Sequence, residues 1–200
     1  MIDYDKLKPI GSGESPRTPI VPEDGLYLFD PGIHHENALY QTPTRLTNKF
    51  VRAFRKVWGQ LPESDRNTLK DYWQGRWRNH DTPKIAINLP CPHTVVPCKA
   101  DCRGRGHELA FELRWIEWST PSELAHLIAH ELGHAISYPH GWMSQHKCET
   151  WDGLQQCVAC ECRAFSYMAA WGFDPFLETL PKGKTLMKRF ASRRELAVCY

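Results

Sequence analysis

Apolar residues recur at the spacing of an amphipathic helix between residues 121 and 136. Their spacings of one, three and four positions place them on one helix face: Leu124, Leu127, Ile128, Leu132, Ala135 and Ile136. The preceding run Thr120-Pro121-Ser122-Glu123 combines an N-cap threonine, a first-turn proline and a capping-box glutamate. The sequence therefore predicts a helix that begins after Thr120 and packs on a core.

Four other segments show helix patterns, at residues 46–58, 62–77, 153–171 and 184–197. The first two predict a helical hairpin, since Phe50, Phe54 and Val57 share one face and Pro62 separates the helices. We expect the 153–171 helix to pack antiparallel to the 121–136 helix. Its predicted packing face consists of Val158, Phe165, Met168 and Ala169.

Alternation of apolar and polar residues predicts strands at residues 84–89 and 107–118. In the longer one, the apolar and charged sets alternate as Leu109, Phe111, Leu113 and Trp115 against Glu108, Glu112 and Arg114. Residues 90–106 are expected to form a loop that contains cysteine and glycine. Residues 1–45 are rich in proline and glycine, which predicts an extended arm whose Leu26-Tyr27-Leu28-Phe29 segment docks on the body.

These elements predict an α+β protein in three parts: the arm (1–45), the helical hairpin (46–80) and a core with a C-terminal helix (81–200). Two hundred residues with 42% hydrophobic residues suffice for one compact domain with an appendage. The net charge of +2 does not indicate a nucleic-acid or membrane partner. No apolar run approaches the ~20 residues of a membrane span, and the first residues lack a signal-peptide profile. We therefore expect a cytoplasmic protein, with export as the alternative that the cysteine content leaves open.

The helix at 121–136 also carries the sequence His130-Glu131-Leu132-Gly133-His134. The two histidines are one helical turn apart, so both imidazoles can reach one metal ion. Glu131 follows the first histidine and is placed to act on a water at the metal. Burying these groups inside an apolar helix without a partner would be costly. Two neutral nitrogens and a nearby carboxylate are what zinc-assisted hydrolysis of a peptide bond requires.

This segment resembles the active-site helix of the zincin metallopeptidases, and the resemblance covers residues 107–138, with weaker similarity to about residue 175. It implies a minimal zincin fold: a small twisted mixed sheet, an active-site helix and a second helix that bears a ligand. It also implies a zinc ion (Zn2+) bound by His130 and His134, with Glu131 as the general base. In zincins the strand before the helix pairs with an extended peptide substrate, and we expect the same of residues 107–118.

Two residues compete to be the third zinc ligand. Glu161 lies in Glu161-Cys162-Arg163-Ala164, which resembles the Glu-x-x-Ala of gluzincin-type peptidases, and its predicted helix would hold the carboxylate in place. His140 follows His134 by six residues, as in metzincins and SprT-like DNA-associated proteases, although Ser137 stands where metzincins have glycine. We expect Glu161 to be the ligand and retain His140 as the alternative. A cysteine is a third choice.

Peptide hydrolysis also requires a hydrogen-bond donor near the developing oxyanion. Tyr167 and Tyr138 are the candidates for this role, together with His126 and His146. The sequence does not rank them.

The chain contains eight cysteines. Clustered cysteines in a reducing compartment favour metal binding over disulfides. Four of them could build a second, structural metal site or form disulfides: Cys98, Cys102, Cys157 and Cys160. Buried or reduced thiols are the remaining interpretation.

The expected partner is a protein or peptide substrate. Basic residues near 45–56 and 184–194 keep nucleic acid as an alternative, although such stretches are usually solvated faces. Two other functions stay open: a metal-stapled binding module without hydrolytic activity, and a zinc amidase resembling peptide deformylase. Neither the natural substrate nor the oligomeric state follows from the sequence.

Overall fold

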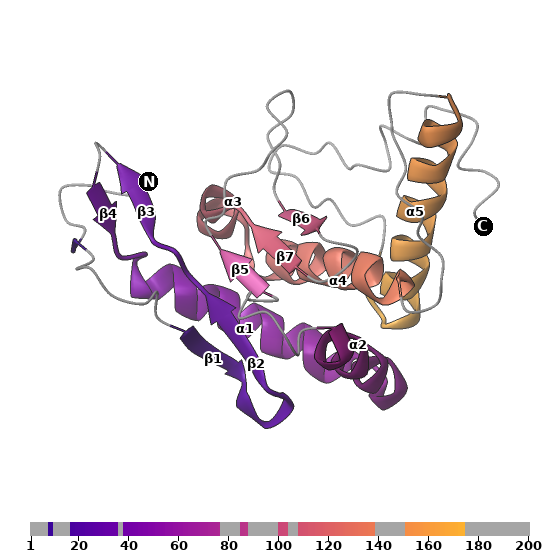
Figure 1. Cartoon of the computed structure of the whole chain (residues 1–200), viewed down its shortest axis with the longest axis horizontal. Helices are drawn as coiled ribbons and strands as arrows, with labels where there is room; N and C mark the ends of the chain where they lie inside the picture. The colour runs from indigo at the N-terminus through magenta and orange to yellow at the C-terminus, as the bar shows by residue number, and fades with distance from the viewer. Residues whose placement is uncertain are drawn as a thin grey trace.

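A computed structural model of the chain describes residues 8–9, 17–35, 38–76, 85–87, 100–103, 108–138 and 151–174. Within these residues the chain is α+β, as expected, and combines a mixed sheet with five α-helices (Figure 1). The helices are α1 (Thr44–Gln60), α2 (Glu63–Arg76), α3 (Leu113–Trp118), α4 (Pro121–Ser137) and α5 (Trp151–Ala170).

The main sheet has five strands in the order β1-β2-β5-β7-β6. Their bounds are β1 (Arg17–Val21), β2 (Leu26–Phe29), β5 (Ile85–Ile87), β6 (Ala100–Arg103) and β7 (Glu108–Phe111). The central strands β2, β5 and β7 run parallel, while β1 and β6 are antiparallel to their neighbours at the two edges. Every residue of β5 is buried, which fits an all-apolar strand in the middle of a sheet. A separate hairpin contains β3 (Ile33–His35) and β4 (Ala38–Tyr40).

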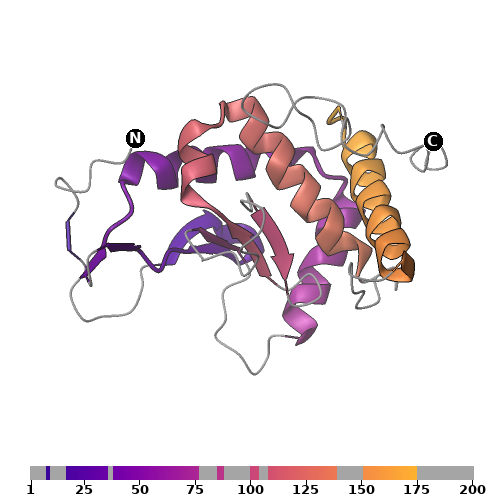
Figure 2. The same ribbon diagram turned by 90° about the horizontal axis from the view of Figure 1, so that it is seen from above.

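Helices α1 and α4 pack against each other on the same side of the main sheet (Figure 2). The predicted helical hairpin is confirmed as α1 and α2, and its expected apolar face of Phe50, Phe54 and Val57 is fully buried. The two helices are joined through aromatic contact, since the Trp58 and Trp73 rings stack with centroids 6.1 Å apart. In the described part of the chain, α1 and α4 thus form a layer on one side of the sheet. This sheet contains β7, the last strand before α4.

Residues 17–29 belong to the body of the protein. The expected docking of Leu26–Phe29 occurs as strand β2, which pairs with β5 and buries Leu26 and Leu28. The short 3-10 turn between β1 and β2 (Pro22–Asp24) is tied to the helical hairpin by Asp24. Its carboxylate accepts hydrogen bonds from the Trp58 indole (2.7 Å) and the Lys70 ammonium (2.8 Å).

The prediction of a single strand over residues 107–118 was wrong in its second half. The strand β7 ends at Phe111, and residues 113–118 form α3. Leu113 and Ile116 are the buried residues of α3, and their spacing of three is that of a helix, whereas the alternation that continued through Leu113 was fortuitous. Lys49 of α1 holds the end of α3 by donating to the Glu117 and Ser119 carbonyls.

Two smaller expectations also require correction. The loop predicted for residues 90–106 contains β6, which pairs with β7. The packing face predicted for residues 153–171 included Ala169, but Ala169 is exposed, and Ala164 is buried in its place beside Phe165 and Met168. The terminal helix expected at 184–197 lies outside the described residues, as does most of the segment 77–107.

The predicted start of α4 is confirmed in detail. Thr120 Oγ1 accepts a hydrogen bond from the Glu123 backbone N–H (3.2 Å), and the Glu123 carboxylate accepts one from the Thr120 N–H (2.6 Å). Together these bonds form a capping box, and Pro121 occupies the first turn. None of the helices in the described part of the chain is long and apolar enough to cross a membrane.

Candidate metal centre

Helices α4 and α5 cross with their backbones in close contact at Gly133 and Ala164. A Cβ atom built on Gly133 would lie 2.7 Å from the carbonyl oxygen and 2.9 Å from the Cα of Ala164. Any side chain at residue 133 would therefore separate the helices. The glycine between the two histidines of α4 lets α5 approach within reach of both (Figure 1).

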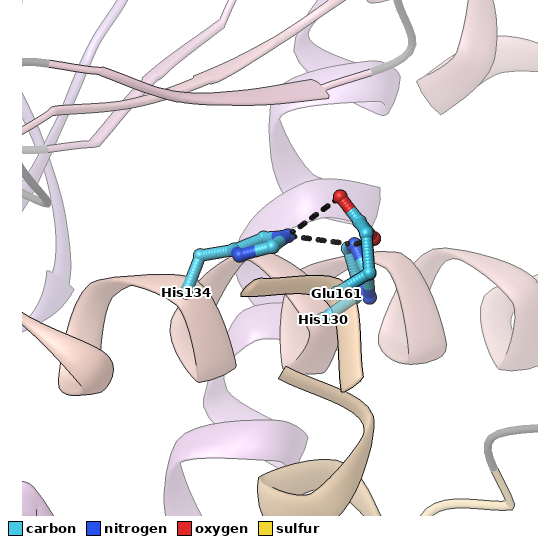
Figure 3. A group of neighbouring side chains, drawn as sticks. All are labelled: His130, His134 and Glu161. Atoms are coloured by element: carbon cyan, nitrogen blue, oxygen red, sulfur yellow. Dashed lines mark hydrogen bonds and ion pairs between the residues drawn. The ribbon is translucent and has the colours of Figure 1, made fainter. Parts of the chain in front are cut away.

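Three side chains converge beside this crossing: His130 and His134 from α4, and Glu161 from α5 (Figure 3). The two Nε2 atoms are 3.0 Å apart, Glu161 Oε2 lies 3.2 Å from His130 Nε2, and Oε1 lies 3.5 Å from His134 Nε2. One donor atom from each residue lies within 4.8 Å of the other two. The structure thus joins the two histidines of the sequence motif with the residue predicted as the third ligand.

The donor set fits a metal ion. Within the part of the chain that the structure describes, Glu161 Oε2 is a buried side-chain oxygen that accepts no hydrogen bond. Such an oxygen has lost water without gaining a donor, which is costly unless a cation compensates it. Two imidazole nitrogens and a carboxylate that face one another are all Lewis bases, and a cation between them would satisfy all three.

The electrostatics of the cluster also favour positive charge. Burial alone would lower the pKa of His134, but the Glu161 carboxylate and the Cys160 sulfur outweigh it and hold that pKa well above its ordinary value. Burial raises the pKa of Glu161, whereas the His134 and His130 imidazoles lower it more, so its net pKa lies well below the usual range. The cluster therefore attracts a cation, either a proton or a metal ion.

Glu131, the expected general base, lies on α4 directly after His130 and is 6% exposed. Its role as the general base is an expectation from the sequence motif.

Cys160 was not expected at this site. Its sulfur lies 3.1 Å from Nδ1 of His134, on the side of the ring opposite the nitrogen that faces Glu161. From its place among the clustered cysteines, Cys160 was expected in a second metal site or in a disulfide. Cys160 carries a buried thiol outside any disulfide and contacts a predicted ligand. The only signal for this contact in the sequence was that Cys160 directly precedes Glu161. Two adjacent residues of one helix contact the same side chain of another helix only when the two helices are very close.

The remaining candidates for the oxyanion donor lie in different surroundings. Tyr138 forms the C-terminal cap of α4, one turn beyond His134. Tyr167 packs on Trp171, with ring centroids 5.6 Å apart, and burial together with the nearby Asp65 carboxylate raises its pKa. His126 is buried against Phe173, with its Nδ1 2.8 Å from the Ser122 carbonyl oxygen. His140, the alternative third ligand, and His146 lie outside the described residues.

Little of the predicted cysteine cluster falls on described side chains. Cys98 lies outside the described residues, and Cys102 and Cys157 lie in β6 and α5 without described side chains. Cys162 is disulfide-bonded, and its partner is not among the cysteines whose side chains are described. The thiol of Cys160 and the disulfide of Cys162 thus occupy neighbouring positions of α5.

Three basic residues of the stretch near 45–56 make contacts within the protein. Arg45 forms an ion pair with Glu117 at 2.9 Å, Lys49 donates to the end of α3, and Arg55 donates to the Ile20 carbonyl. These contacts give the three basic residues a structural role within the protein.

The chain was compared with models of known protein families, with curated proteins and with solved structures, and none of the three comparisons gave a match.

Proposed function

We propose that this protein is a zinc-dependent metallopeptidase of the zincin type, with His130, His134 and Glu161 as the zinc ligands. The observation that carries the proposal is that these three side chains converge, and that one of them, Glu161, has a buried oxygen that accepts no hydrogen bond. Two histidines and one glutamate form the ligand set of catalytic zinc sites in metallopeptidases, and three protein ligands leave one position open.

Glu131 is the general base in this proposal. It removes a proton from the attacking water and then delivers that proton to the departing amine of the cleaved peptide bond. When bound, zinc supplies a Lewis acid that polarises the carbonyl and lowers the pKa of water. Burial of Glu131 supports the assignment, because a carboxylate shielded from bulk water keeps its proton within the site.

The sheet offers an edge for an extended peptide, although it is not the edge expected from the sequence. Strand β7 is paired on both sides, with β5 and β6, so it has no open edge. Strand β6 ends the described sheet and packs against α4, the helix that bears both histidines. We therefore assign substrate pairing to β6, where backbone hydrogen bonds would hold the peptide beside the metal.

The proposal is tested by metal analysis and proteolysis with three forms of the protein. Wild-type protein purified without chelator is expected to contain one zinc ion per chain and to cleave a casein-like substrate. Glu131→Gln is expected to keep the zinc and lose the activity. The control is Glu63→Gln, which makes the same chemical change at an exposed position of α2 and should leave both properties unchanged.

Each other outcome has a defined meaning. Iron in place of zinc would indicate a different class of enzyme, since two histidines and one carboxylate also bind Fe(II) in oxygenases. Bound zinc without cleavage of any member of a broad peptide library would support a metal-stapled binding module. Protein without any bound metal would refute the proposal.

A further inference from the structure

The imidazole of His134 has a neighbour at each of its two nitrogens. Nε2 lies 3.5 Å from Glu161 Oε1 and 3.0 Å from His130 Nε2, whereas Nδ1 lies 3.1 Å from the sulfur of Cys160. All three neighbours are buried or half-buried, and Cys160 is 6% exposed. The ring is therefore held between the metal cluster on one side and a single sulfur atom on the other.

This arrangement determines which tautomer can bind a metal. Nε2 must present its lone pair to a cation in the cluster, so the hydrogen of the neutral ring must be on Nδ1. An Nδ1–H group pointing at the sulfur donates a hydrogen bond to it. The opposite arrangement, with the thiol donating to Nδ1, would place the ring hydrogen on Nε2 and block the metal.

We propose that Cys160 is a positioning residue that accepts a hydrogen bond from Nδ1–H of His134 and thereby fixes this ligand in its metal-binding tautomer and orientation. The inference rests on the metal site of the proposed function. Histidines that bind metals usually donate a hydrogen bond from the N–H of their second ring nitrogen to a carboxylate, a carbonyl or water, and loss of such a partner typically weakens metal binding about 10- to 100-fold. Here a sulfur atom has that role.

Two observations favour this role over the separate cysteine-based metal site considered from the sequence. Cys160 is adjacent to Glu161 on α5, so one helix supplies both the third ligand and the group behind the second ligand. The sulfur also contacts a nitrogen that cannot bind the same metal as Nε2. Simple packing remains the competing explanation, because a buried cysteine also fills volume as a small apolar residue.

Two substitutions separate hydrogen bonding from packing. Cys160→Val fills the space but accepts no hydrogen bond, whereas Cys160→Ser retains an acceptor but fills less space. The zinc Kd of each variant is measured by competition with a chromophoric chelator, and the folded state is checked by circular dichroism. The Co2+-substituted forms are compared by visible absorption, and the Nδ1–H proton of His134 is followed by NMR in the zinc-loaded protein.

If Cys160 positions His134, Cys160→Val raises the zinc Kd about 10- to 100-fold, shifts the Co2+ absorption bands and speeds exchange of the Nδ1–H proton. Cys160→Ser lies closer to wild type in all three measurements. The inference is overturned if Cys160→Val binds zinc as tightly as wild type, or more tightly than Cys160→Ser. If wild-type protein itself binds no zinc, the proposed function fails and the inference falls with it, so the two failures are distinguishable.

Discussion

Substitution of Gly133 by alanine tests whether the close crossing of α4 and α5 builds the metal centre. The added Cβ would lie 2.7 Å from the Ala164 carbonyl oxygen, about 0.7 Å inside the ordinary contact limit of 3.4 Å. Both nearest atoms belong to the backbone of α5, so no side-chain rotation relieves the clash. The two helices must move apart by several tenths of an ångström, and Glu161 lies only one turn from Ala164.

The expected effects on stability and on metal binding are separate. Overpacking of this kind costs about 1–3 kcal/mol, while alanine in place of glycine stabilises a helix by about 0.5–1 kcal/mol. Gly59→Ala in α1 is the matched control, because its Cβ would meet no atom within 4 Å. Both variants replace a helical glycine by alanine, so the difference between their free energies of unfolding mainly reports the clash, at about 1–3 kcal/mol.

Metal affinity gives the sharper result. The side chains of a metal site must be held within about 0.5 Å of their productive positions. Displacement of Glu161 in Gly133→Ala should therefore raise the zinc Kd about 10-fold or more. Gly59→Ala should bind zinc like the wild type. Urea unfolding in the presence of chelator measures stability, and chelator competition measures the Kd. The reasoning is refuted if Gly133→Ala equals Gly59→Ala in both measurements.

Two further predictions concern single carboxylates. Glu161→Gln keeps the shape of the third ligand but removes its charge, so the purified variant should lose most of its zinc in dialysis, as measured by atomic absorption; full retention would point to another ligand. Hydrogen bonds from Lys70 and Trp58 lower the pKa of Asp24 in the folded protein below its ordinary value of 3.8. The ionised Asp24 carboxylate therefore stabilises the folded state at pH values above 3.8, and this contribution is lost as the pH falls through the folded-state pKa. Asp24→Asn should therefore lower the free energy of unfolding at pH 7 by about 1–2 kcal/mol, and the difference from wild type should shrink below pH ~4 in urea titrations; a difference independent of pH would contradict the argument.

Local signals in the sequence were sufficient for the helices of the site. The capping box at Thr120 and the apolar period after it predict α4 from its own residues, because both features act within one or two helical turns. The buried face of α1, with Phe50, Phe54 and Val57, was predicted from its own residues for the same reason. The pairing of Glu161 with the two histidines was predicted by resemblance to gluzincins, and the structure brings the three together.

Other features depended on contacts between distant segments. The change from β7 to α3 at Glu112 was missed because Leu109, Phe111 and Leu113 satisfy a strand pattern, while burial of Ile116 depends on α1. The edge strand β6 was missed because its alternation covers only four residues, Ala100 to Arg103, directly before Gly104, and because it depends on pairing with β7. Local patterns do not contain this information, since a partner strand or helix decides which face is buried.

The contact between Cys160 and His134 shows why small residues at a helix crossing bear on the chemistry. Cysteine has one heavy atom beyond Cβ, so its sulfur reaches a neighbouring helix only where the two backbones are unusually close. Helix axes are ordinarily 8–10 Å apart, and the absence of a Cβ at Gly133 permits the closer approach that the Ala164 contacts record. The close approach permitted by Gly133 therefore has two consequences for the proposed metal centre. It places the Glu161 carboxylate near both imidazoles, and it places the short side chain of Cys160 against Nδ1 of His134. A longer acceptor at residue 160, such as glutamate, could reach His134 without this close approach. The glycine at residue 133 and the cysteine at residue 160 therefore belong to one arrangement, because the distance between the two helix backbones determines how long a side chain can be and still contact His134.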